Sequence, residues 1–390
     1  MPDFLLGVNY WPRESAMAMW TRFDPAAIAA DFAQIAKLEL RVVRFFLRWD
    51  VFQPVPETID AIALERFATV LDLADAAGLR TVPTLFCGHM SGANWLPSWT
   101  LDPRIGAGRF RTISEDGESP YGIGDFYTNE RLLAAQFTFV RAVGRRARGR
   151  DAVLVWDIGN EFSNLRAAET PSDGASWSAR LTHELTRVSK RPVTGGIHGD
   201  DVSGERGLRP STLCAPWDLA TMHGYPAYSE FARGVDDPEV VPFLCELIAG
   251  LARKPVLFSE FGNPQCPSQG SAMPCLDEAA MADYAYAVLD RLHDRGALGA
   301  LWWCWTDYAH ALAQTPPFDR APHELRFGLV RNDGSPKPVA AALRAFARER
   351  REIRPAALRA LVDETAYYAH LPTSLANAYR NYVATREATR

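Results

Sequence analysis

The sequence predicts an α/β protein, a (β/α)8 TIM barrel with a C-terminal helical extension. Three observations support this prediction. Short apolar runs alternate with amphipathic stretches along most of the 390 residues. Eight such units fit within about 340 residues, the size of a closed barrel with insertions. The short runs are apolar throughout, as is typical of strands buried on both faces of a parallel sheet.

The candidate strands are rich in β-branched and aromatic residues. In chain order they are Leu5–Tyr10, Arg41–Phe46, Arg80–Phe86, Ala152–Ile158, Pro192–His198, Leu219–Tyr225, Pro255–Glu260 and Leu298–Trp305. Apolar spacing of three and four predicts helices between them: Pro25–Leu38, Ile62–Ala77, Asn129–Arg148, Ala175–Ser189, Pro238–Leu251 and Leu276–Asp294. The segment Gly199–Pro210, where the fifth helix would lie, is rich in Gly and Asp and is predicted to be a loop.

A doubly wound open sheet is the alternative with the same alternation. That fold normally has a glycine-rich phosphate turn after its first strand, and this chain has Tyr10-Trp11-Pro12-Arg13-Glu14 there, which favours the barrel. We predict the barrel over residues 1–346. Residues 347–390 are predicted to form a helical extension that packs on the barrel or lies at an oligomer interface. A homo-oligomer is therefore one of the expected states of the protein.

The composition is that of a globular protein that acts on neutral molecules. Hydrophobic residues make up 47% and charged residues 23%, and the formal net charge of −5 is too mild to indicate a nucleic-acid partner. The start of the chain lacks a basic segment followed by an apolar run, and no apolar stretch reaches the roughly 18 residues of a membrane span. We therefore expect a cytoplasmic protein with no membrane partner.

The six cysteines include no Cys-x-x-Cys pair, so a structural zinc site is not expected. Cys266 and Cys275 lie in one loop rich in Pro, Ser and Gly, where they can form a disulfide. Free thiols are the expectation in a cytosolic protein.

Two glutamates follow apolar strands at the carboxyl edge of the predicted barrel, where such barrels place their active sites. Strand four leads into Asn160-Glu161, and strand seven ends in Ser259-Glu260. A carboxylate at the mouth of a buried strand is costly unless it has partners or a chemical task. Strands four and seven lie across the barrel from each other, so both carboxylates face one cleft, as glycoside hydrolysis requires. For either glutamate alone, a structural salt bridge would be the better interpretation.

The pair Asn160-Glu161 and the segment Ser259-Glu260-Phe261-Gly262 resemble the signatures of clan A glycoside hydrolases, with family 5 and its mannanases and mannosidases most similar. The resemblance covers roughly residues 4–346. It implies a retaining β-glycosidase that needs no cofactor or metal, with Glu161 as acid/base and Glu260 as nucleophile. Glu161 must then be protonated at working pH, which partial burial would favour.

Further residues match the family at the ends of other strands. The resemblance implies that Arg44 lies near the nucleophile, and that Tyr225 of His223-Gly224-Tyr225-Pro226 hydrogen-bonds the nucleophile. It also implies a tryptophan platform beneath the sugar at the end of strand eight. In Trp302-Trp303-Cys304-Trp305 the alternation of a strand places Trp302 opposite the other two, and Trp305, nearest the carboxyl end, is the expected platform.

The remaining expectations concern sugar contacts. Asn160 can hydrogen-bond the sugar 2-hydroxyl, a contact that strengthens in the transition state. His89, after strand three, is a candidate for binding sugar hydroxyls, as is His198 at the end of strand five. His223, after strand six, is also a candidate substrate-binding residue, and for all three a core histidine is the alternative. The long loop Ser91–Phe126 is expected to bind substrate or cap one end of the cleft.

The sequence leaves the substrate open. A β-mannoside or short manno-oligosaccharide is the main expectation, because the pattern after strands six to eight is similar to that of mannosidases. An exo-β-glucosidase or β-galactosidase is the alternative on the same scaffold. A non-hydrolytic carbohydrate-binding barrel would be expected to lose one of the glutamates. A metal-dependent hydrolase would need His or Asp residues clustered at several strand ends.

Overall fold

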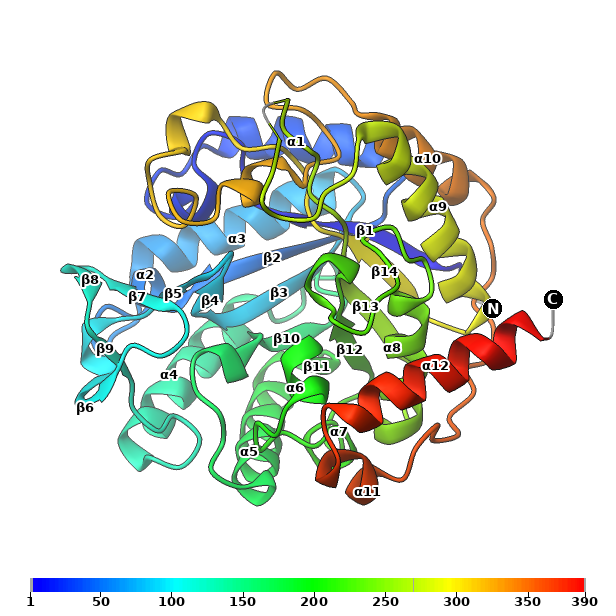
Figure 1. The fold of residues 1–390 in the computed structure, drawn as a ribbon. Helices are drawn as coiled ribbons and strands as arrows, with labels where there is room; N and C mark the ends of the chain where they lie inside the picture. The colour runs from blue at the N-terminus through cyan, green and yellow to red at the C-terminus, as the bar shows by residue number, and fades with distance from the viewer. Residues whose placement is uncertain (1–2, 269, 389–390) are drawn as a thin grey trace.

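The computed structural model describes residues 3–268 and 270–388, and it forms the predicted parallel barrel (Figure 1). The strand order is β11-β10-β3-β2-β1-β14-β13-β12. A hydrogen bond of 2.9 Å from the backbone N–H of His223 to the carbonyl of Ile197 joins the last strand to the first and closes the circle. The barrel strands are β1 (Leu5–Tyr10), β2 (Val42–Arg48), β3 (Arg80–Cys87), β10 (Trp156–Asn160), β11 (Val193–Gly196), β12 (Ala220–His223), β13 (Val256–Phe261) and β14 (Gly299–Trp302).

Helices surround the strands, and several begin where a side chain satisfies the first backbone N–H groups. Asp24, Asp60, Asn129 and Asp277 each accept a hydrogen bond from the first turn of the helix that follows. The long outer helices are α1 (Pro25–Lys37), α3 (Ala61–Ala76), α4 (Glu130–Arg146), α5 (Pro171–Ser189), α8 (Val240–Ala252), α9 (Glu278–Asp294) and α10 (Pro338–Arg348).

The predicted loop between strands five and six contains two short helices, α6 (Gly199–Ser203) and α7 (Pro210–Leu213). The side chain of Asp201 accepts a hydrogen bond of 3.0 Å from the backbone N–H of His198 and so starts α6. The expectation of a plain loop is therefore corrected, because local capping supports helix that periodicity alone does not reveal.

The barrel interior is apolar at one end and polar at the other. Val42, Val82, Val155, Leu257 and Leu301 form a fully enclosed cluster inside the barrel. Arg44 lies two residues after Val42 on β2, so it faces the same interior but nearer the carboxyl edge. The larger core lies between the strands and the helices.

The insertion after β3 is a small β structure, which we call the β4–β9 insertion (residues 89–123; cyan, left of Figure 1). It comprises β4 (His89–Met90), β5 (Ala93–Trp95), β6 (Leu101–Gly106), β7 (Arg111–Ser114), β8 (Gly117–Ser119) and β9 (Tyr121–Ile123). Arg111 forms an ion pair with Asp319, and Arg320 forms one with Glu118. The insertion is thus attached to the loop that follows β14.

The C-terminal extension packs on the barrel (red, Figure 1). It contains α11 (Glu364–Ala369) and α12 (Thr373–Glu387). Three tyrosine hydroxyls anchor it: Tyr367 donates to the carbonyl of Val202 at 2.6 Å, Tyr368 to the carbonyl of Asp201 at 2.7 Å, and Tyr379 to the Asp237 carboxylate at 2.6 Å. The extension therefore contacts the loop after β11 as well as the outer helices.

Cys266 and Cys275 are joined in a disulfide, which corrects the expectation of free thiols. The bridge closes a short loop after β13. Two backbone hydrogen bonds already hold the ends of this loop together, from Cys266 to Leu276 at 2.8 Å and from Leu276 to Pro264 at 3.0 Å. Within residues 3–268 and 270–388, none of the helices combines the length and the apolar character needed to cross a membrane.

Candidate active site

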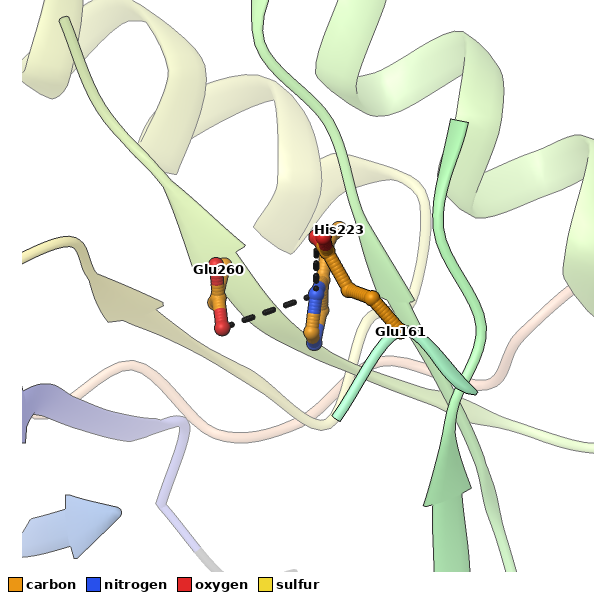
Figure 2. Close-up of side chains that lie close together, drawn as sticks. All are labelled: Glu161, His223 and Glu260. Carbon is orange, nitrogen blue, oxygen red and sulfur yellow. Dashed lines mark hydrogen bonds and ion pairs between the residues drawn. The ribbon is translucent and has the colours of Figure 1, made fainter. Parts of the chain in front are cut away.

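Glu161 and Glu260 meet at the mouth of the barrel, with His223 between them (Figure 2). The Nδ1 atom of His223 lies 2.9 Å from Oε1 of Glu161 and 3.5 Å from Oε1 of Glu260. One carboxylate oxygen of each glutamate and this nitrogen all lie within 4.8 Å of one another. The two acidic groups therefore face a common point.

The backbone around Glu161 is shaped to present its side chain. Glu161 has φ 46° and ψ 48°, a left-handed conformation that few non-glycine residues adopt and that tends to persist at functional sites. Gly196 of β11 allows the close approach, because a Cβ there would lie 2.3 Å from the carbonyl oxygen of Gly159. The Nδ2 group of Asn164 then donates to Oε2 of Glu161 at 3.0 Å.

Arg44 is fully buried beneath the site and connects β2 to three other strands. Its Nη1 donates to Oε1 of Glu260 at 2.5 Å and to Asn9 at 3.0 Å. Its Nε and Nη2 donate to Asp157 at 2.9 and 2.7 Å. Arg44 is therefore both the partner of the second glutamate, as the resemblance implies, and an ion pair that links β2 to β10, since one guanidinium presents donors in several directions.

The other side of Glu260 is held by Tyr225, as the sequence predicts. The Tyr225 hydroxyl donates to Oε2 of Glu260 at 2.7 Å. Burial, together with the adjacent Glu260 carboxylate, raises the pKa of Tyr225 well above its ordinary value, so the hydroxyl keeps its proton. Both oxygens of Glu260 therefore accept a hydrogen bond from a fixed donor.

Asn160 and His89 lie beside Glu161. Asn160 accepts from Nη2 of Arg44 at 2.8 Å and donates to the carbonyl of His89 at 3.0 Å, which leaves one amide hydrogen for a ligand. The Nδ1 atom of His89 lies 2.8 Å from Oδ1 of Asn94, and its Nε2 lies 3.7 Å from Oε2 of Glu161.

The expected role of Trp305 as platform is wrong. Trp305 has no exposed surface and lies beside Asp31 of α1, outside the barrel. Trp303 is 4% exposed, and its indole N–H donates to Glu324 at 3.3 Å. Its ring contacts Phe46, over which the Arg44 guanidinium lies, so Trp303 lies nearer the candidate site than Trp305 does. The physical reason is that β14 ends at Trp302, so strand alternation does not extend to Trp305.

The electrostatics of Glu161 also differ from the expectation. Burial acts to raise its pKa, but the charge of His198, the hydrogen bond from His223 and the charge of His89 outweigh burial and lower the pKa below its ordinary value. Three histidines rather than an apolar wall surround this carboxylate. The sequence could not reveal this, since the histidines follow three different strands.

Sequence reasoning also missed Asp157 and Glu324. Asp157 precedes the Gly159-Asn160-Glu161 segment and is the main partner of Arg44; a charged residue within an otherwise apolar run was the available signal. Glu324 accepts hydrogen bonds from Ser91, Tyr228 and Trp303, which follow or end three different barrel strands. No local pattern marks such a residue.

Glu161, His223 and Glu260 also have the composition of a small metal site. However, the Glu260 oxygen nearest His223 already accepts from the guanidinium of Arg44 at 2.5 Å. A permanent positive charge at that oxygen disfavours a second cation there. The arrangement fits two carboxylates that act on an organic substrate better than it fits metal ligands.

Comparison with protein-family models and with curated protein sequences finds no match. Solved structures are similar over nearly the whole chain. The exo-β-1,4-mannosidase Op5Man5 from Opitutaceae bacterium strain TAV5 is 26% identical with a TM-score of 0.75, covering 90% of this chain and 61% of that protein. A GH5_18 protein from Streptomyces cattleya, solved with Manβ1-4GlcNAc, is 24% identical with a TM-score of 0.75, covering 91% and 82%.

A β-galactosidase from the psychrophilic Marinomonas ef1 shares the fold at 16% identity and a TM-score of 0.63, covering 90% of this chain and 59% of that one. Of the first of these proteins, the Opitutaceae enzyme, this chain spans about three fifths of the length. These likenesses confirm the barrel and the resemblance to clan A glycoside hydrolases, with family 5 structures among the most similar.

Proposed function

We propose that this protein is a retaining β-glycosidase that acts on β-mannosides or short manno-oligosaccharides, with Glu161 as acid/base and Glu260 as nucleophile. The observation that carries the proposal is the convergence of both carboxylates on Nδ1 of His223, with oxygens within 4.8 Å. Retaining enzymes place their carboxyl groups about 5 Å apart, whereas inverting enzymes leave a wider gap for a water molecule.

In the first step Glu260 attacks the anomeric carbon while Glu161 protonates the glycosidic oxygen, so the leaving sugar departs as an alcohol and a glycosyl ester forms on Glu260. Arg44 and Tyr225 hold the two Glu260 oxygens and fix the attacking carboxylate. In the second step Glu161 takes a proton from water, whose oxygen attacks the anomeric carbon and releases Glu260. Two inversions give net retention.

Two observations support a mannoside and action at the chain end. The Opitutaceae enzyme is named as an exo-β-1,4-mannosidase, and its likeness to this chain extends over 90% of the sequence. The β4–β9 insertion is attached to the loop after β14 by the Arg111–Asp319 and Arg320–Glu118 pairs, so the two loops form a joint wall at one side of the barrel mouth. Such a wall favours removal of a terminal sugar over internal cleavage.

The test is hydrolysis of p-nitrophenyl β-mannoside, β-glucoside and β-galactoside by wild type, Glu260→Ala and the control Glu352→Ala. Glu352 pairs with Asp3 just before β1, at the opposite end of the barrel from the two glutamates. We expect the mannoside to be hydrolysed fastest, Glu260→Ala to lose at least about 1,000-fold in kcat, and EDTA to have no effect. Mannose should be the only early product from manno-oligosaccharides. Faster hydrolysis of the glucoside or the galactoside would contradict the proposed mannoside substrate. Full activity in Glu260→Ala would overturn the proposed mechanism.

A further inference from the structure

Beside Glu161 lies a buried chain of three polar side chains that the mechanism above does not use: His198, Ser163 and Asp201. Ser163 Oγ lies 2.8 Å from Nε2 of His198 and donates to Oδ1 of Asp201 at 2.5 Å. The other ring nitrogen of His198, Nδ1, lies 3.8 Å from Oε2 of Glu161. All three residues are at least nine-tenths buried.

Hydrogen counting fixes which nitrogen of His198 titrates. The Ser163 hydroxyl has one hydrogen, and an ionised Asp201 can only accept, so that hydrogen goes to Asp201. Ser163 must then accept from His198, which places a permanent hydrogen on Nε2. The proton that His198 gains or loses is therefore the one on Nδ1, the nitrogen that faces Glu161.

We propose that His198 is a positioning residue that shares one proton with Glu161, between Nδ1 of the histidine and Oε2 of the glutamate. His198 thereby sets the pH range over which the acid/base residue holds the proton that it donates. One proton is distributed between the two groups: when it is on Nδ1 Glu161 is ionised, and when it is on Oε2 both groups are neutral. At 3.8 Å the two sites are coupled by charge and not by a direct hydrogen bond, so the proton exchanges through solvent in the cleft. The inference rests on the proposed function, because it concerns the same acid/base residue.

The charges around His198 support a shared proton. Burial acts to lower its pKa, but the carboxylates of Asp201 and Glu161 outweigh burial and raise that pKa above its ordinary value. Because the pKa of Glu161 is lowered at the same time, the resting proton lies on the histidine. Charged and titratable groups face this pair from all the surrounding elements: His89 after β3, Arg109 of the β4–β9 insertion, Asp200 and Asp201 of α6, His223 of β12, Tyr225 and Tyr228 after β12, and Glu260 of β13.

The C-terminal extension braces this arrangement from behind. Tyr368 donates to the backbone carbonyl of Asp201, and Tyr367 donates to that of Val202, both within α6. The Asp201 carboxylate in turn accepts a hydrogen bond of 3.0 Å from the backbone N–H of His198. A continuous series of hydrogen bonds thus runs from α11 to His198, whose ring faces the acid/base residue.

The proposal fixes the sign of a pH effect. Two sites that share one proton retain it to a higher pH than Glu161 alone. The apparent pKa belongs to the pair, and the proton has two places to bind instead of one. The alkaline limb of kcat/KM reports loss of the acid proton from the free enzyme. Replacing His198 by a residue that does not titrate removes one of the sites that hold the proton, while His223 and His89 stay the same in both enzymes, so the limb moves to lower pH.

The experiment compares the pH profiles of wild type, His198→Gln and Asp201→Asn on the p-nitrophenyl glycoside that wild type hydrolyses fastest. We expect the alkaline midpoint to fall by about one pH unit in His198→Gln, and by a smaller amount in Asp201→Asn, which keeps a hydrogen-bonding side chain but removes the charge that favours the protonated histidine. If His198→Gln does not fold, the shift in Asp201→Asn decides.

The control is His293→Gln. His293 is also buried, and its Nε2 lies 2.9 Å from the carbonyl of Glu352, remote from the glutamate pair. Its replacement should leave the midpoint unchanged. A 2,4-dinitrophenyl glycoside, whose leaving group needs no proton, should be cleaved by His198→Gln within about threefold of wild type.

An unchanged alkaline midpoint in a folded His198→Gln or Asp201→Asn enzyme would overturn the inference, whatever the loss in rate. Equal loss on both aryl glycosides would assign His198 a purely structural role and have the same consequence. Failure of the proposed function is distinguishable, since wild type would then cleave none of the glycosides or Glu260→Ala would remain active.

Discussion

Arg44 shows how a single side chain organises the candidate site. Its guanidinium contacts Asp157, Asn160 and Glu260 at once, and it is fully buried. A buried cation is tolerated only when it is paired and hydrogen-bonded, and here the partners come from two strands, Asp157 and Asn160 from β10 and Glu260 from β13. The charge that stabilises the buried acids is therefore the same charge that fixes the proposed nucleophile and the side-chain amide of Asn160.

Removal of the acid/base carboxylate should separate the two steps of the proposed reaction. In Glu161→Ala, a 2,4-dinitrophenyl glycoside should still form the glycosyl-enzyme at a rate within about tenfold of wild type, whereas a p-nitrophenyl glycoside should be attacked at least about 100-fold more slowly. Added azide should accelerate turnover of the dinitrophenyl substrate, because an anion fills the space left by the carboxylate and needs no general base.

NMR identifies the product of this reaction, and we expect a β-glycosyl azide. Asn164→Ala, which removes one donor to Glu161 but keeps the carboxylate, is the matched control and should show no azide rescue. Rescue to an α-azide would contradict the assigned geometry.

At the scale of elements, the C-terminal extension is the part whose position matters most for the inference on His198. α11 contacts the α6 segment, while α12 passes α8 (Figure 1). The sequence predicts the extension as helical and identifies its tyrosines, but it leaves open whether they contact the barrel or another subunit. Long-range contacts of this kind depend on the closed barrel and not on local pattern.

Two tyrosines allow this link to be tested. Tyr368→Phe and Tyr379→Phe each remove one buried hydrogen bond and should each lower the free energy of unfolding by about 1 kcal/mol. Only Tyr368→Phe should also lower the alkaline midpoint of kcat/KM, because Tyr379 contacts Asp237 and not α6. Equal effects of both variants on the pH profile would show that general loosening, not the contact with α6, is responsible.

The elements themselves were largely predictable. β1 has the predicted bounds, and β13 differs by one residue at each end, because apolar runs between turn residues define buried strands well. β10 begins four residues later than predicted, since Ala152–Val155 joins β3 through only an isolated bridge. The internal structure of the β4–β9 insertion was not predicted, because its short strands lack the period that longer ones show.

At the scale of the whole molecule, the topology explains which site residues could be predicted. Glu161, Glu260, Arg44 and Tyr225 lie at or near the carboxyl ends of barrel strands, and that position, with the family resemblance, indicates their roles. Hydrogen bonds join Arg44 and Tyr225 to Glu260, and Glu161 is hydrogen-bonded to His223, whose Nδ1 lies 3.5 Å from Glu260. The same reasoning fails for Trp305, because a strand that ends early changes which face each following residue occupies.

The chemistry of the site was less predictable than its location. Burial alone predicts a protonated Glu161, but the charges that lower its pKa come from histidines after three different strands. Their convergence is a property of the closed barrel. The same holds for the chain of Ser163, His198 and Asp201, whose members are up to 38 residues apart in sequence.

The most direct test of the account is to trap the covalent intermediate. Wild-type protein is incubated with a 2-deoxy-2-fluoro-β-mannosyl fluoride, which slows breakdown of a glycosyl ester more than its formation, and the labelled peptide is identified by mass spectrometry. The account predicts one sugar per chain, attached to Glu260. Attachment to another residue, or complete turnover to a product of inverted configuration with no covalent species, would contradict it.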